Sequence, residues 1–374
     1  MNRRNFLKYS ALSGAAAASL PYVGRSMAAQ PTDAVGPDPA QQAWMDLGFG
    51  MFIHFGINTY YDVEWSDGTL DPIKVNPTRL DTDQWCATAK AAGMRYIVLV
   101  TKHHDGFCLW PSRYTDYSVA STPFKKDIVA ELANSAAKHG LKLGLYYSLW
   151  DRHETSHDTD EYRYVLDFMK GQLEELLTGY GPVVELWFDG FWKKQQSGWT
   201  KKLAAGELEG EAGFQEQNQA RDEAFVQAWR QEGAYRWQMD HIYQYIKSLQ
   251  PDCLVMNNST TAYPGVPLHP VDIRSGEKYT QPNPNDQKVW EWLGKSRYLP
   301  LQIETTMSVR GNERFKSGNW FWHAADTSVA SREQIRQYLS VARQMDANLL
   351  LNCGPDPEGR LRPVDVDTLT HLQD

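Results

Sequence analysis

The chain has 374 residues, of which 42% are hydrophobic and 22% charged, and its net charge is −8. This much apolar material supports a large folded core and excludes a chain that is disordered throughout. An acidic chain with no recurring blocks of Lys or Arg is a poor candidate for binding nucleic acid. No apolar run approaches the roughly 20 residues needed to cross a bilayer, so we expect no membrane span.

Aromatic residues make up 12% of the chain, which is high for an acidic protein. Flat aromatic rings stack on the apolar faces of sugars. The composition therefore favours a carbohydrate or small-molecule site.

Residues 1–29 are predicted to be an export signal. Arg3-Arg4 is followed by Phe-Leu-Lys, by a weakly apolar stretch up to Leu20, and by small residues up to Ala29 that suit signal peptidase. This order resembles a twin-arginine signal, and a disordered cytosolic tail is the alternative. Export predicts a periplasmic or extracellular location for residues 30–374.

The four cysteines, Cys86, Cys108, Cys253 and Cys353, are widely spaced and match no zinc-binding pattern. Most of them adjoin apolar residues, so we expect buried free thiols. We expect no metal ion and no other cofactor.

Beyond a polar leader, short apolar runs alternate with amphipathic stretches. Continuous apolar runs are typical of strands that are buried on both faces. The expected strands are 50–55, 96–100, 142–147, 183–188, 253–257, 301–303 and 348–352. The expected helices are 82–92, 127–139, 160–177, 236–249 and 331–345.

The repeated strand–helix order predicts a parallel α/β fold. The glycine-rich phosphate turn expected early in a doubly wound sheet does not occur, so a (β/α)8-like TIM barrel is favoured over an open sheet. Residues 30–374 would form this barrel. A polar insertion at about 193–233 is expected to be either a solvated loop or a lid over outer subsites.

Several expected strands end in polar or ionisable residues, and in a barrel such ends cluster at the catalytic face. These residues are His54, His103, His104, Tyr147, Asp189, Asn258 and Glu304. His103 and His104 could form a metal site, but neighbours on an extended segment point to opposite sides. Neutral imidazoles that hydrogen-bond to substrate hydroxyls are the better account.

An apolar run that includes Trp187 precedes Asp189, and a glycine follows it. This pattern places its carboxyl group at the lip of the sheet, where it is partly desolvated. An ordinary Asp–Gly turn is the alternative.

Five motifs together resemble, in sequence and order, those of the α-L-fucosidases of glycoside hydrolase family 29. The resemblance runs from residue 43 to about 363. The motifs are GFGMFIHFG at 48–56, KHHDGFCLW at 102–110, GLYYS at 144–148, ELWFDG at 185–190 and NLLLNCGP at 348–355.

The resemblance implies a (β/α)8-like barrel that hydrolyses α-L-fucosides with retention. It assigns Asp189 as the nucleophile and Tyr147 as a tyrosine beside it. The implied substrate-binding residues are His54, Glu64, Trp65, His103 and His104, with Trp320 or Phe321 as an aromatic platform for the C5 methyl group. Trp187 is a further candidate because, next to Asp189, it can wall a pocket and exclude water.

The general acid/base is less tightly specified, because the family does not keep it in one motif. Glu277 lies in the stretch after the Asn257-Asn258 strand, where family acids usually occur. Glu304 matches a strand-end glutamate that is expected to be structural or substrate-binding. Glu277 is the preferred acid/base, and a surface ion pair with Lys278 or Arg274 is its alternative.

Two departures from the family pattern affect the predictions. The family usually has an arginine after the Asn-Asn pair, where this chain has Ser259-Thr260, so Arg274 is the candidate replacement. A C-terminal β-sandwich is not expected, since the sequence stops at Asp374.

The expected reaction is a double displacement on a fucosylated oligosaccharide or glycoconjugate. Asp189 would attack, staying ionised through hydrogen bonds, while Glu277 acts first as acid and then as base. The alternatives are a fucose-binding homologue without catalysis and a hydrolase that acts on α-L-galactosides.

Overall fold

The structure is a computed structural model that describes residues 35–190, 236–258, 267–268, 270–279, 281–309 and 318–374. The predicted export signal and the polar insertion at about 193–233 lie outside these residues. The protein's fold is therefore described from Gly36 onward.

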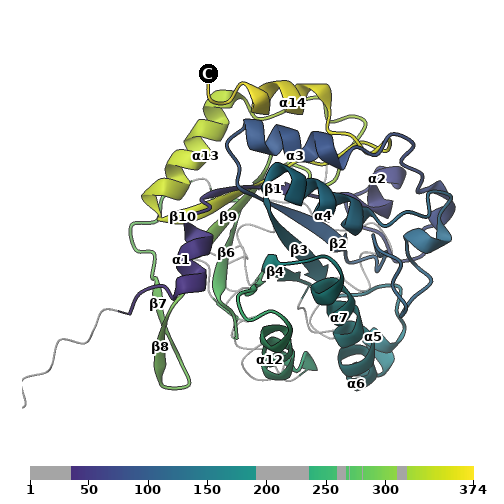
Figure 1. Cartoon of the computed structure of the whole chain (residues 1–374), viewed down its shortest axis with the longest axis horizontal. Coiled ribbons are helices and arrows are strands. Elements are labelled where there is room, and N and C mark those ends of the chain that lie inside the picture. Colours follow the sequence, from purple (N-terminus) through teal and green to yellow (C-terminus); the bar gives the residue numbers. More distant parts are fainter. Residues whose placement is uncertain (1–34, 191–235, 259–266, 269, 280, 310–317) are drawn as a thin grey trace, which may run out of the picture. The chain divides into compact units, whose positions relative to one another are not determined.

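Eight parallel strands form a closed barrel in the order β1-β10-β9-β6-β5-β4-β3-β2. Figure 1 shows helices packed around the outside of this barrel. The (β/α)8 expectation is confirmed. The barrel strands are β1 (Phe49–Ile53), β2 (Tyr96–Lys102), β3 (Lys142–Ser148), β4 (Val183–Asp189), β5 (Leu254–Asn257), β6 (Ile273–Glu277), β9 (Leu301–Thr306) and β10 (Ala347–Asn352).

The helices match the five expected stretches and add shorter elements. Residues Tyr164–Met169 form a π-helical segment (η3), which divides the expected helix 160–177. The α-helices are α1 (Pro39–Met45), α2 (Ile57–Tyr61), α3 (Thr82–Ala91), α4 (Ile128–His139), α5 (Ser156–Thr159), α6 (Glu161–Arg163), α7 (Lys170–Gly179), α12 (Met239–Leu249), α13 (Arg332–Gln344) and α14 (Pro363–Thr370); 3₁₀ turns occur at η1 (Pro72–Lys74) and η2 (Val119–Ser121).

Capping residues define the helix ends as the sequence predicts. The Asp127 carboxylate accepts a hydrogen bond from the Ala130 amide at 2.9 Å at the start of α4, and Gly140 ends that helix at φ 72°. Ser331 begins α13 with a capping box. These caps satisfy backbone groups that the ends of the two helices would otherwise leave without a partner.

Side chains alternate between two buried layers along the strands. Phe52, Tyr146 and Trp187 belong to a cluster inside the barrel, whereas Tyr147 and Phe188 belong to the larger cluster outside it. Because the side-chain period of a strand is two, neighbouring residues must face opposite layers. This alternation decides which strand-end residues can reach the mouth of the barrel.

Two strand regions were not expected from the sequence. β6 has the sequence IRSGE, with one apolar residue, and it carries Glu277 at its end rather than in a loop. β7 (Val289–Trp292) and β8 (Lys295–Tyr298) form an antiparallel hairpin between β6 and β9. β6 and β8 are mostly polar, and β7 (VWEW) is only four residues long and interrupted by Glu291, so neither region has the continuous apolar run used to recognise the other strands.

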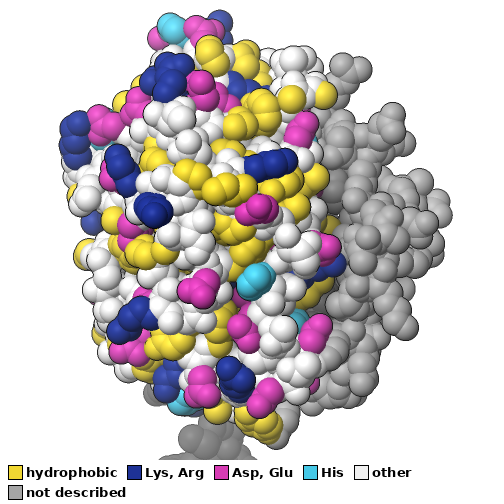
Figure 2. All heavy atoms as spheres, turned by 90° about the vertical axis from the view of Figure 1, so that its right-hand side faces the viewer, with side chains coloured by type: hydrophobic (Ala, Val, Ile, Leu, Met, Phe, Trp, Pro, Cys, Tyr) yellow, Lys and Arg dark blue, Asp and Glu magenta, His cyan; other side chains and the backbone are white. Residues whose placement is uncertain are grey.

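All four cysteines are buried, as predicted. The face shown in Figure 2 carries Lys and Arg interspersed with Asp and Glu, together with hydrophobic side chains. Within the described residues, no helix has both the length and the apolar character needed to cross a membrane.

Candidate active site

Asp189 and Glu277 occupy equivalent places at the carboxyl ends of β4 and β6. β5 lies between these two strands in the barrel, and Asn258 follows it directly. In a parallel barrel these strand ends open at one mouth. The topology therefore brings three polar side chains, one from each neighbouring strand, to the same place.

The Asp189 carboxylate is largely buried, with 14% of its side chain exposed. The Tyr146 hydroxyl donates to Oδ2 at 2.9 Å, and the Gly190 amide donates to Oδ1 at 2.8 Å. Burial, followed by the negative charge of Glu277, nevertheless raises the pKa of Asp189 to about 7. The hydrogen bonds expected to keep Asp189 ionised do lower its pKa, but desolvation is the larger effect.

Gly190 is required for this geometry. Its φ is 72°, and a Cβ there would lie 2.8 Å from the Trp150 Cβ and 3.0 Å from the Ser148 hydroxyl oxygen. A larger residue would have to push this wall away from Asp189. The Asp–Gly pair is thus a turn and also a means of presenting the carboxylate.

Asn258 bridges the two carboxyl groups. Its Nδ2 lies 3.3 Å from Asp189 Oδ1 and 2.9 Å from Glu277 Oε2. These two oxygens can lie no further apart than the sum of the distances, about 6 Å, which is below the ~6.5–9.5 Å typical of inverting glycosidases. The arrangement is compatible with the ~5–5.5 Å separation of retaining enzymes.

Glu304, at an interior position of β9, is completely buried. Its Oε2 accepts a hydrogen bond from the Gly276 amide at 3.1 Å and lies 3.2 Å from the Ser275 hydroxyl, while Oε1 has no hydrogen-bond partner. Burial, with a contribution from Glu277, raises the pKa of Glu304 well above its ordinary value. Burial therefore favours the protonated form of Glu304 beneath the mouth, whereas Glu277 is partly exposed beside Asp189.

The three predicted histidines converge on one wall of the site. The His103 ring is 4.1 Å from the His104 ring and 6.0 Å from the His54 ring, measured between centroids. The chain turns after β2, so His103 and His104 reach the same side despite being adjacent. Burial is the largest cause of the lowered pKa of all three, which falls to about 3 for His54 and His104 and well below the usual value for His103.

The hydrogen bonds assign the tautomers of two of these neutral rings. His54 Nδ1 lies 2.7 Å from the side-chain oxygen of Asn352, an acceptor, so this nitrogen donates. His104 Nδ1 lies 2.7 Å from the Ser148 oxygen, whose own proton goes to the Trp150 carbonyl, so it also donates. Each ring therefore presents Nε2 as an acceptor, and that of His104 lies 3.7 Å from Asp189 Oδ2.

The tyrosine beside the nucleophile candidate is Tyr146, not Tyr147. Tyr147 is fully buried outside the barrel, where its hydroxyl bonds to Lys102 at 3.0 Å and Gln172 at 2.7 Å. The prediction was one residue out, and in a strand such a shift moves the side chain to the opposite face.

Two predicted tryptophans border this centre. Trp187 stacks on Tyr146 at 5.2 Å inside the barrel, and its Nε1 donates to Gln302 at 3.2 Å. Trp65 is half-buried and contacts the His104 ring edge-on at 5.8 Å. Trp187 thus contributes to the floor and Trp65 to the rim.

Glu64 faces a backbone segment that carries aromatic residues. Its carboxylate accepts hydrogen bonds from the amides of Trp320 and Phe321 at 3.0–3.1 Å and lies 2.8 Å from His323 Nε2. The Trp320 and Phe321 rings lie 5.1 and 5.4 Å from the ring of His54. Glu64 therefore holds this aromatic segment against the histidine wall.

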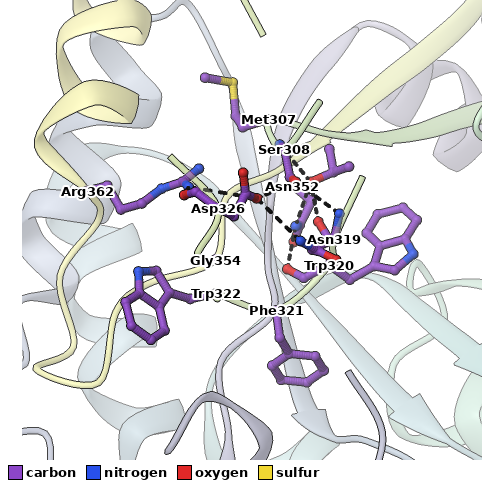
Figure 3. A pocket seen from close by; sticks show the side chains of 11 residues that line it. Met307, Ser308, Asn319, Trp320, Phe321, Trp322, Asp326, Asn352, Gly354 and Arg362 are labelled. Carbon is purple, nitrogen blue, oxygen red and sulfur yellow. Dashed lines mark hydrogen bonds and ion pairs between the residues drawn. The ribbon is translucent and has the colours of Figure 1, made fainter. Parts of the chain in front are cut away.

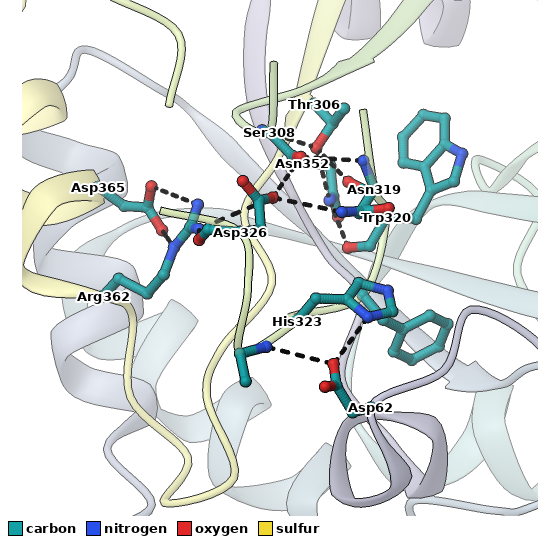
Figure 4. Close-up of polar contacts among 12 residues, drawn as sticks. Asp62, Thr306, Ser308, Asn319, Trp320, His323, Asp326, Asn352, Arg362 and Asp365 are labelled. Atoms are coloured by element: carbon teal, nitrogen blue, oxygen red, sulfur yellow. Dashed lines mark hydrogen bonds and ion pairs between the residues drawn. The ribbon is translucent and has the colours of Figure 1, made fainter. Parts of the chain in front are cut away.

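The other side of the aromatic segment is also anchored. The Trp320 carbonyl accepts from Asn352 at 2.7 Å, and the Asn319 amide donates to the Ser308 hydroxyl at 3.0 Å (Figure 4). A small pocket behind Trp320 is lined in part by Asn352 and Asp326 (Figure 3). Polar contacts thus fix the segment from two directions.

Arg274 does not replace the expected family arginine. Two of its guanidinium nitrogens bind Asp286 at 2.8 and 2.9 Å, and Nε donates to the Leu299 carbonyl at 3.0 Å. Its neighbour Ile273 faces the barrel interior, so alternation directs Arg274 outward. The position after Asn258 lies outside the described residues.

Tyr146 is a functional candidate that sequence reasoning missed, whereas Asn258 was expected at the catalytic face as a polar strand end but was given no role. One rule could have found both roles. β3 and β5 are the neighbours of β4, so an inward-facing residue near the end of either strand lies close to the Asp189 carboxylate. Across the described ranges, no group of three or more His, Cys, Asp or Glu side chains is arranged to hold a metal ion.

A family model for α-L-fucosidases matches residues 24–374. The chain belongs to the α-L-fucosidase family. It is 31% identical over 352 residues to α-L-fucosidase 1 of Arabidopsis thaliana, covering 90% of this chain and 60% of that protein.

Solved α-L-fucosidase structures share the fold. A glycoside hydrolase family 29 member from an unknown rumen bacterium is 30% identical, with a TM-score of 0.66, over 90% of this chain and 56% of that one. A putative α-L-fucosidase from Bacteroides ovatus is 29% identical, also with a TM-score of 0.66, over 90% and 55%. The chain thus spans less than two thirds of the length of these relatives.

A second family model, for the twin-arginine translocation signal, matches residues 1–19. This match confirms the export signal predicted from Arg3-Arg4. This member of the α-L-fucosidase family is therefore directed out of the cytoplasm, to a periplasmic or extracellular location.

Proposed function

We propose that this protein is a retaining exo-α-L-fucosidase that releases L-fucose from fucosylated oligosaccharides or glycoconjugates by double displacement. The observation that carries the proposal is the pair formed by Asp189 and Glu277, which share the amide of Asn258. Family membership supports the choice of sugar.

In the first step, a carboxylate oxygen of Asp189 forms a bond to the anomeric carbon as the glycosidic carbon–oxygen bond breaks. Glu277 gives its proton to the departing oxygen. The Tyr146 hydroxyl and the Gly190 amide hold the Asp189 carboxylate during the attack.

In the second step, Glu277 takes a proton from water, whose oxygen attacks the anomeric carbon of the fucosyl-enzyme. The bond to Asp189 breaks, and the released sugar has the α configuration of the substrate. Two inversions at one carbon give this retention.

The remaining site residues would bind and orient the sugar. The neutral rings of His54, His103 and His104 are suited to hydrogen bonding with hydroxyl groups, since burial keeps them uncharged. Trp320 and Phe321 would cover an apolar face of the ring near the C5 methyl group. Trp65 and Trp187 would complete the enclosure.

A substrate panel with the product anomer recorded at early times by NMR tests the proposal. We expect turnover of aryl α-L-fucosides and fucosylated oligosaccharides, with α-L-fucose formed first. Fucose binding without turnover of any α-L-fucoside would indicate a non-catalytic protein, and faster turnover of α-L-galactosides would change the sugar. β-L-Fucose as the first product would exclude double displacement.

A further inference from the structure

We infer that Asn258 is a positioning residue, which holds both carboxyl groups of the proposed catalytic pair with one side-chain amide. The inference rests on the proposed function and adds a residue that neither the motifs nor the family resemblance assigned. It begins from the location of Asn258 directly after β5, the strand between those that carry Asp189 and Glu277.

The backbone places the amide between the two acids. The Asn258 N–H donates to the Phe188 carbonyl at 2.7 Å, so this residue is hydrogen-bonded to the end of β4. Met256, two residues earlier, faces the barrel interior, and alternation turns Asn258 the same way. The position is thus determined by the barrel.

The two hydrogens of the amide match the two acceptors around it. Nδ2 lies 3.3 Å from Asp189 Oδ1 and 2.9 Å from Glu277 Oε2, and a side-chain amide nitrogen has one N–H for each. The rotated amide would place its oxygen against two carboxyl groups. Only one orientation of the amide therefore satisfies the site.

Ser275 selects this orientation. Its hydroxyl donates to Asn258 Oδ1 at 3.1 Å and lies 3.2 Å from Glu304 Oε2. A hydroxyl has one proton, so Ser275 can donate to Asn258 only if Glu304 supplies the other hydrogen. Burial favours the protonated form of Glu304, which can supply this hydrogen. With Glu304 protonated, the chain runs in one direction from Glu304 through Ser275 and Asn258 to the catalytic pair.

This chain has an electrostatic consequence at Asp189. Donation by Asn258 lowers the pKa of Asp189 against the larger effect of burial, which raises it. Loss of the donor should raise that pKa further. The ionised nucleophile would then appear only at higher pH.

Asn258→Ala tests the inference, measured as kcat and kcat/KM on an aryl α-L-fucoside across pH. We expect kcat to fall roughly tenfold to hundredfold, as for small displacements of catalytic groups. The acid limb of kcat/KM should also move to higher pH. A purely structural role would lower activity equally at all pH values.

Two further variants guard against misfolding and test the chain. Asn258→Asp keeps the shape but replaces a donor with a third carboxyl group, so the loss and the shift should both exceed those of Asn258→Ala. Ser275→Ala should give a smaller shift in the same direction. Asn134→Ala, on an exposed position of α4, is the matched control and should leave the profile unchanged.

The outcomes separate this inference from the proposed function. The inference is wrong, and the function stands, if the unmodified protein turns over α-L-fucosides and both variants behave like it. That result would be a kcat/KM within threefold and an unchanged acid limb for Asn258→Ala and Asn258→Asp. If the unmodified protein turns over no α-L-fucoside, the proposed function fails first.

Discussion

Asp189 combines burial with a nearby carboxyl group, and both raise its pKa toward about 7. The carboxylate must be ionised to attack, so kcat/KM should rise with pH as Asp189 loses its proton. A carboxyl group at its ordinary pKa of ~3.9 would give an acid limb about three pH units lower. The pH profile therefore reports directly on the environment of this residue.

Glu277→Gln removes both the negative charge and the proton transfer of this side chain. The leaving group and the pH profile distinguish the two effects. With a poor leaving group the first step should slow by roughly 10²- to 10⁴-fold, because general acid catalysis is lost. With a good leaving group, such as a dinitrophenolate, the loss should be much smaller.

The same Glu277→Gln variant should shift the acid limb of the first step to lower pH, since one cause of the raised pKa of Asp189 is removed. Pre-steady-state release of the phenolate across pH measures both effects. Glu291→Gln, on the exposed hairpin, serves as control. An equal loss for both leaving groups would show that Glu277 is not the acid.

At the residue scale, the sequence located groups that end an apolar strand. Asp189 and the three histidines follow such runs and were placed at the mouth. Tyr146 was missed and Asn258 was given no role, because those roles depend on which face of the strand a residue occupies and on which strands are neighbours. Neither property is visible without the register of the barrel.

At the scale of elements, the aromatic segment around Trp320 and Phe321 depends on Glu64. Glu64 accepts hydrogen bonds from two backbone amides and contacts His323. Figure 4 shows that His323 also contacts Asp62, at 2.8 Å. Hydrogen bonds to a charged group contribute ~1.5–3 kcal/mol each. The contact joins the loop after β1 to the segment that precedes α13.

Glu64→Gln should loosen this segment and raise KM by roughly tenfold or more, since a neutral amide removes the charge that strengthens the hydrogen bonds to Trp320, Phe321 and His323. If Glu64 acts mainly by positioning, kcat should change less than KM. Steady-state kinetics with Glu333→Gln, at an exposed position of α13, as control makes the comparison. An unchanged KM would contradict this role.

His323 should make the attachment of the segment sensitive to pH. Burial opposes its charge, but hydrogen bonds and charges from Glu64 and Asp62 outweigh it and raise the pKa of His323. A raised pKa in the folded state stabilises the contact at low pH, and this contribution is lost as pH rises through that pKa. We expect KM to increase on the alkaline side, and the increase to disappear in His323→Asn.

The element that sequence reasoning missed most clearly is β6. Its polar residues satisfy their hydrogen bonds within the folded barrel, as Arg274 does with Asp286. Tertiary contacts stabilise this strand rather than its own apolar pattern. Glu277 was therefore expected in the stretch after the Asn257-Asn258 strand, without the strand that carries it being recognised.

At the scale of the whole molecule, the alternation of apolar runs and helices was sufficient to predict the barrel. The strand order then decides the site, because it makes β5 the neighbour of both β4 and β6. Residues 189 and 277 are far apart in sequence, and only this strand order brings their carboxyl groups together. In the proposed mechanism, Asp189 attacks the anomeric carbon and Glu277 transfers the proton.

The most direct measurement is the anomer of the fucosyl azide formed when azide is added to variants that turn over an activated aryl α-L-fucoside. In Asp189→Ala, azide should occupy the vacated space and attack the substrate, which gives the β-L-fucosyl azide. In Glu277→Ala, azide should attack the fucosyl-enzyme, which gives the α-L-fucosyl azide. Full activity of Asp189→Ala without azide, or the same anomer from both variants, would contradict the assignment of the two carboxyl groups.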